Sequence, residues 1–124
     1  MKVNKGLVFC FVTSVDDSQA EISCRKDGSN STIVLEKRKD EDRDILILHF
    51  PFKVAERNWE NVISIVRSSE PDPFTKRTIE TLKGLHSVEN FSLTRCSVTV
   101  VKGKAFTIQQ TLMEVIPAML NLSE

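Results

Sequence analysis

The sequence contains no tyrosine, a single tryptophan and no excess of positive charge. Its 17 Lys and Arg residues balance 17 Asp and Glu residues, so the formal net charge is zero. Nucleic-acid binders draw much of their affinity from basic side chains that neutralise phosphates, and single strands also stack on aromatic rings. The balanced charge and the few stacking aromatics therefore argue against a nucleic-acid partner.

The cysteines are few and widely separated: Cys10, Cys24 and Cys96. A disulfide framework calls for an even and dense set, and zinc or iron–sulfur sites usually show a C-x-x-C pair, which is missing. We therefore expect three free thiols in a reducing compartment. No glycine-rich dinucleotide motif or P-loop is present either. No cofactor is predicted, although iron–sulfur or metal binding stays open.

Long apolar runs are also missing. The apolar stretch that follows Gly6 has only about nine residues before Asp16, which is too short to cross a membrane. It has no small-residue cleavage site of the kind that ends a signal peptide. We expect a cytoplasmic protein with no membrane partner.

The N-terminal part reads as strands joined by turns. Residues 6–15 are apolar and rich in β-branched and aromatic side chains, and residues 20–25 alternate between apolar and polar. Further strands are predicted at 32–36 and 45–50, with the mixed-charge run 36–44 as a solvated connecting loop. Turn residues separate these strands, so residues 1–52 are predicted to form an antiparallel β-meander.

The C-terminal part mixes helices and strands. We predict a strand at 61–67, with a helix as the alternative. A first helix over 73–83 is capped by Asp72 and ends at Gly84. Strands at 88–94 and 97–101 follow. A Thr107–Gln110 capping box then opens a second helix that continues past Pro117.

These elements predict a single α+β domain over residues 1–124. A mostly antiparallel sheet carries two helices packed on one face, and residues 60–122 form a ferredoxin-like βαββα portion.

Residues 70–120 resemble the N-terminal domain of Nfu/NifU-type iron–sulfur scaffold proteins. The resemblance rests on the Leu82-Lys83-Gly84-Leu85-His86-Ser87-Val88 turn, the Ser97–Lys102 strand and the closing helix with Ile108, Leu112 and Ile116. A ferredoxin-like half has the same order of elements. In that family the cluster-binding C-x-x-C lies in a separate domain, so the resemblance implies an association with iron–sulfur assembly rather than cluster ligands in this chain.

No catalytic constellation stands out. Cys96, beside Arg95 in a predicted turn, is the candidate reactive thiol. His86 lies at the opposite end of the strand that precedes Cys96, so the two do not form a dyad. The carboxylates of residues 40–44 lie in a predicted turn, where weak calcium binding is a minor alternative.

The aromatic residues gather around Phe50, Phe52 and Trp59. One interpretation places them in the core and its lid. The other places them at the rim of an exposed patch that binds a partner.

Together these observations predict a non-enzymatic binding or adaptor module whose partner is another protein. The alternatives are a small thiol-dependent enzyme that uses Cys96, and a homo-oligomeric structural protein formed by pairing of sheet edges. The sequence does not fix the oligomeric state.

Overall fold

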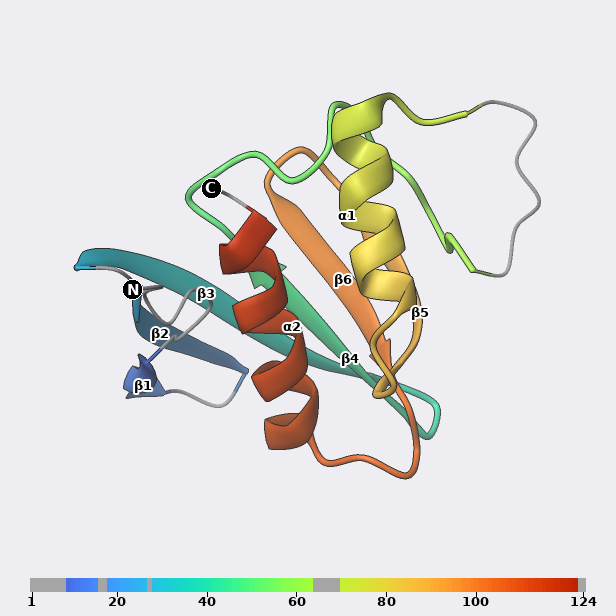
Figure 1. The fold of residues 1–124 in the computed structure, drawn as a ribbon. Coiled ribbons are helices and arrows are strands. Elements are labelled where there is room, and N and C mark those ends of the chain that lie inside the picture. The colour runs from blue at the N-terminus through green and yellow to red at the C-terminus, as the bar shows by residue number, and fades with distance from the viewer. Residues whose placement is uncertain (1–8, 16–17, 27, 64–69, 123–124) are drawn as a thin grey trace.

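The computed structural model of the chain describes residues 9–15, 18–26, 28–63 and 70–122. Six strands form one antiparallel sheet in the order β1-β2-β3-β4-β6-β5, and Figure 1 shows both helices on the same face of it. The predicted α+β class is therefore confirmed. The elements are β1 (Phe9–Val15), β2 (Gln19–Lys26), β3 (Ser29–Asp40), β4 (Arg43–His49), α1 (Pro73–Lys83), β5 (Val88–Leu93), β6 (Ser97–Lys102) and α2 (Ile108–Leu122).

The N-terminal strands follow one another as hairpins. Lys26 pairs with Ser29 at the β2–β3 turn, where Gly28 has a φ of 79°. Tight hairpin turns commonly use this left-handed backbone, which glycine adopts without steric cost. The predicted turn at Asp16-Asp17 lies outside the described residues.

The predicted loop over residues 36–44 is wrong. β3 continues to Asp40, β4 begins at Arg43, and only Glu41 and Asp42 turn the chain. The charges lie on paired strands, where opposite signs attract. Lys104 Nζ donates to Asp42 Oδ2 at 3.0 Å, and this hydrogen bond holds the pKa of the Asp42 carboxyl below its usual range.

In the C-terminal half of the chain, β6 lies between β4 and β5 in the sheet. α1 connects β4 to β5. The strand before α1 in this arrangement is therefore β4, whereas the sequence predicts it at 61–67. Residues 64–69 lie outside the described residues, and the ferredoxin-like description of residues 60–122 stays a prediction.

Residues 59–63 run along the edge of β5. Trp59 and Leu93 form an isolated antiparallel bridge, and the Val62 N–H donates to the Phe91 carbonyl at 2.8 Å. Asn61 has a φ of 46°, so the chain turns here instead of continuing as a strand. These bonds occupy backbone groups of β5 that an edge strand otherwise leaves unpaired.

Both helices begin with the predicted caps. Asp72 Oδ2 accepts a hydrogen bond from the Thr75 N–H at 3.0 Å, which lowers the pKa of the Asp72 carboxyl. At α2, the Gln110 N–H donates to Thr107 Oγ1 at 3.0 Å and the Thr107 N–H donates to Gln110 Oε1 at 2.9 Å. α2 continues through Pro117, as predicted. Neither helix is long and apolar enough to cross a membrane, among the residues described.

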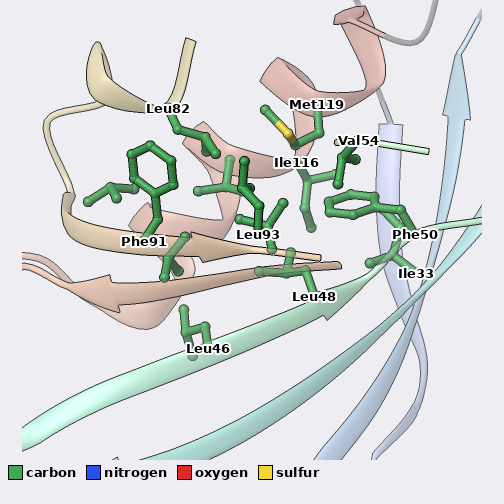
Figure 2. Packing of buried hydrophobic residues seen from close by; sticks show 14 of the residues in the cluster. Ile33, Leu46, Leu48, Phe50, Val54, Leu82, Phe91, Leu93, Ile116 and Met119 are labelled. Carbon is green, nitrogen blue, oxygen red and sulfur yellow. The ribbon is translucent and has the colours of Figure 1, made fainter. Parts of the chain in front are cut away.

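The core lies between the sheet and the helix layer. Its buried side chains come from both halves of the chain and form one hydrophobic cluster. Burying each of the larger ones stabilises the fold by roughly 1.5–3 kcal/mol. Figure 2 shows members of this cluster pointing toward one another from sheet and helices: Leu48, Phe91, Leu93, Leu82, Ile116 and Met119.

Two of the three cysteines form a disulfide, so the expectation of three free thiols is wrong. Cys10 on β1 lies directly opposite Cys24 on β2, with their Cα atoms 4.1 Å apart. The 13 residues between them obscure this pairing in the sequence, and only the register of the two strands brings the thiols together. Cys96 is free and exposed.

Candidate interaction surface

The three aromatic residues singled out from the sequence are not equally accessible. Phe50 and Trp59 are only 5% and 6% exposed and belong to the core cluster, with Phe52 packed against it. The rings of Phe50 and Phe52 lie 5.2 Å apart. Of the three, only the half-buried Phe52 offers a substantial surface to a partner.

Phe52 lines a shallow depression beside the helices. Phe74 of α1 and Leu122 of α2 line the same depression, together with the exposed residue Arg77. Lys53 also lines it, with Nζ 5.2 Å from the centre of the Phe74 ring and 2.8 Å from Glu56 Oε2. The Lys53 ammonium is thus already paired with the Glu56 carboxylate of the same chain.

The candidate chemical residues lie apart. Cys96 is in the turn between β5 and β6, while the exposed His86 precedes β5, at the other end of that strand. The Phe50 N–H donates to the Cys96 carbonyl at 2.8 Å, so Cys96 continues the pairing of β4 with β6 one residue beyond the pair His49 and Ser97. His49 instead contacts Glu36, whose Oε1 lies 2.6 Å from the imidazole Nε2.

The sheet face away from the helices has an apolar centre. On β4, Leu46 and Leu48 are buried under the helices, so the alternating residues Ile45 and Ile47 face the other way. Val101 on β6 pairs directly with Ile45 and shares its face. With Val34 on β3, these side chains are all half-buried and form what we call the outer strip: Val34, Ile45, Ile47 and Val101.

Charged side chains of both signs border the outer strip on β3. Glu36 pairs across the strands with Ile47, and Arg38 pairs with Ile45. Glu36 Oε1 lies 2.6 Å from Nε2 of the exposed His49, and Glu36 Oε2 lies 3.6 Å from the Arg38 guanidinium. An apolar centre with a polar rim is the anatomy of protein–protein interfaces.

The other border of the outer strip is polar and already bonded. The Asn61 N–H donates to Ser92 Oγ at 3.0 Å, and the Ile63 N–H donates to Asn90 Oδ1 at 2.9 Å. Both acceptors are on β5 and hold the segment that runs along its edge. On this side, the outer strip is therefore bordered by β5 and by the segment bonded to it.

Glu114 of α2 is hydrogen-bonded to Ser87 in the loop before β5. Glu114 Oε1 accepts hydrogen bonds from the Ser87 hydroxyl at 2.5 Å and from the Ser87 N–H at 2.9 Å. These two bonds lower the pKa of the Glu114 carboxyl. Ser87 is fully buried, and the pair has the geometry of a structural clamp rather than of an exposed reactive serine.

Metal-ligating side chains do not converge in the described ranges. Within residues 9–15, 18–26, 28–63 and 70–122, no three His, Cys, Asp or Glu side chains are grouped to hold a metal ion. In the predicted calcium loop, Asp42 is bonded to Lys104, as described above.

No family model, curated protein or solved structure matches this chain. The resemblance of residues 70–120 to NifU-type domains therefore stays an expectation. What the chain can bind has to be argued from its own surface.

The outer strip leaves a signal in the sequence that points to it in retrospect. Residues 45–48 read Ile-Leu-Ile-Leu, which breaks the alternation of a strand that has one face in water. A continuous apolar run is typical of a strand covered on both faces. The described helices cover only one face of β4 (Figure 1).

Proposed function

We propose that this protein is a non-enzymatic binding module that contacts a protein partner through the outer strip of its sheet. The observation that carries the proposal is the pair Ile45 and Ile47. These β-branched side chains alternate on β4 with the buried Leu46 and Leu48, so they face away from both helices in the interior of the sheet. Apolar residues at these positions are stabilised when a partner removes them from water.

The shape of the surface favours a protein over a small molecule. Small ligands bind in concave pockets, whereas the faces of sheets present broad surfaces without deep pockets. Glu36 and Arg38 carry opposite charges beside the imidazole of His49, which suits a partner with a mixed polar rim and not a polyanion.

The resemblance to NifU-type domains extends the proposal to iron–sulfur assembly. Cys10 and Cys24 are bonded to each other in this structure. A cluster would therefore reside on the partner, and the module would act as an adaptor. We also propose that it works in the cytoplasm, where a disulfide is usually transient or redox-sensing.

The test compares affinity purifications, done without oxygen, that use matched surface variants as bait. Ile47→Lys places a cation on the outer strip opposite Glu36, so the new charge has a cross-strand partner in the folded state. Met113→Lys makes the same change of charge at a side chain that is 67% exposed on α2. Ile45→Glu, opposite Arg38, reverses the sign of the added charge.

A true partner is recovered at least about tenfold less with either outer-strip variant and is retained by Met113→Lys. Circular dichroism checks that all three variants fold. Recovery of the same proteins by every variant, or of none by the wild type, would contradict the proposal. Iron and acid-labile sulfide in the recovered complex report on the link to cluster assembly.

A thiol-dependent activity of Cys96 is the alternative that its exposure favours. A catalytic thiol reacts with alkylating agents much faster than an ordinary exposed thiol at neutral pH. Alkylation of Cys96 at the rate of a small-molecule thiol would remove this alternative.

Self-association is the second alternative. β1 is an edge strand of the sheet, and such edges can pair with another copy of the chain. Sedimentation velocity over a range of concentrations checks this. A mass that stays at 14.0 kDa throughout would eliminate self-association.

A further inference from the structure

The disulfide joins the outermost strand of the sheet to its neighbour. β1 is at the end of the strand order and pairs in the sheet with β2. Cys10 and Cys24 close a short loop, with a sequence separation of 14 residues. The bond therefore joins an edge strand to its neighbour and links neither helix to the sheet.

The two cysteines differ sharply in access to solvent. Cys10 is exposed, whereas Cys24 is only 2% exposed and belongs to the core cluster. Thiol–disulfide exchange requires a thiolate to reach one sulfur of the bond. The accessible end of this bond is at Cys10, and the buried end at Cys24 is shielded from direct attack.

We propose that Cys10–Cys24 is a thiol–disulfide exchange site that a thiol reductant opens by attack at Cys10. The attacking thiolate forms a new bond to Cys10 Sγ, and the Cys10–Cys24 bond breaks. Cys24 leaves as a thiolate and takes up a proton. A second reductant thiol then attacks the mixed disulfide and releases the Cys10 thiol. Two electrons pass from the reductant, which becomes a disulfide, to the cysteine pair.

Opening the bond loosens β1 more than any other strand. The β1–β2 ladder has an irregularity between Val12 and Ser14, where the register shifts. Val12 is 55% exposed, so it contributes little burial to hold β1 in place. β2, by contrast, also pairs along its length with β3, and its residues Ala20 and Ile22 are buried.

The proposal is independent of the outer strip, which lies on β3, β4 and β6. Disulfides are rare in the cytoplasm, and a bond that opens by thiol exchange is compatible with the proposed cytoplasmic location. A bond that glutathione opens and closes belongs to a protein that responds to the redox state of its compartment.

The experiment uses the full chain with Cys96→Ser, which removes the third, exposed thiol. The oxidised protein is equilibrated with mixtures of reduced and oxidised glutathione, quenched with acid, alkylated and mapped by mass spectrometry. We expect loss of the disulfide as the fraction of reduced glutathione rises, with the trapped mixed disulfide on Cys10. A mixed disulfide on Cys24, or a bond that stays closed in excess reduced glutathione, would overturn the proposal.

Hydrogen exchange provides the second readout, on the same oxidised and reduced samples. Amides of β1 should exchange about tenfold faster or more after reduction. Amides of β4 and β6 should be unchanged and serve as the internal control. The Cys10→Ser, Cys24→Ser double variant should exchange like the reduced protein. Equal protection of the β1 amides in the oxidised and reduced proteins would overturn the loosening of this strand.

Discussion

At the scale of single residues, hydrogen bonds between side chains and backbone fix positions that apolar packing leaves free. Glu114 is an example, because its carboxylate accepts both the hydroxyl and the backbone N–H of Ser87. Ser87 is fully buried, so without this carboxylate its hydroxyl and its backbone N–H would lose the acceptor they share. The contact ties α2 to the loop that follows α1.

The Glu114 clamp predicts a dependence of stability on pH. The hydrogen bonds from Ser87 lower the pKa of this carboxyl in the folded state. Its contribution is therefore complete above the pKa of the unfolded chain and is lost as the pH falls through the lower native value. Urea unfolding should show a loss of about 1 kcal/mol from this residue as the pH falls below the ordinary pKa of a glutamate, about 4.3.

Glu114→Gln is the variant that isolates this effect. It should lower the stability at neutral pH by about 1 kcal/mol and flatten the acid limb of the curve. Glu80, exposed on α1, is the matched control for Glu-to-Gln substitution. An acid limb that Glu114→Gln leaves unchanged would contradict the role assigned to this carboxylate.

At the scale of elements, local sequence signals decide where the helices begin. The capping box at Thr107 and Gln110 satisfies two backbone N–H groups that a helix start otherwise leaves open. Asp72 and Pro73 start α1 in a similar way. These signals act over three or four residues, so they can be read without knowledge of the fold.

The cap of α2 predicts a measurable loss when it is removed. Thr107→Ala deletes the hydroxyl that accepts from the Gln110 N–H and should lower the free energy of unfolding by about 1 kcal/mol. Thr107→Ser keeps a hydroxyl and should stay close to the wild type. Thermal or urea unfolding of the two variants gives the comparison, and equal stability of both would show that the box contributes nothing.

At the scale of the whole molecule, the sheet has two different ends. One end is the β5 edge, which residues 59–63 accompany through the Trp59–Leu93 bridge. The other is β1, held to β2 by a ladder and a disulfide. The helices cover one face between these ends, and the outer strip lies on the opposite face.

The disulfide should contribute to global stability as well as to the order of β1. In the chain-entropy model, closing a loop of about 15 residues stabilises the folded state by up to about 3 kcal/mol. The Cys10→Ser, Cys24→Ser double variant should therefore unfold at lower urea concentration than the oxidised wild type. The single variant Cys96→Ser, which changes an exposed free thiol, should unfold like the wild type.

Reduced wild type provides the check on this prediction. It should unfold at nearly the same urea concentration as the double variant, because both lack the same bond. A double variant as stable as the oxidised protein would mean that β1 contributes little to the cooperative unit of folding.

The sequence by itself determined the class of the fold and most element positions. Periodicity, turn residues and caps act locally, and they suffice for the hairpins, for both helix starts and for the continuation of α2 through Pro117. It did not reveal that residues 36–44 form paired strands, because opposite charges such as Lys39 and Asp44 face each other only once the β3–β4 hairpin has formed. Local composition therefore made them resemble a loop.

Only the tertiary structure decided the features on which the proposed function depends. The register of β1 on β2 brought Cys10 opposite Cys24, and tertiary packing placed Phe50 and Trp59 in the core. The same packing turned Leu46 and Leu48 inward and left Ile45 and Ile47 on the other face. These outcomes depend on contacts between residues far apart in the chain, and a local pattern cannot specify which of two faces the helices will cover.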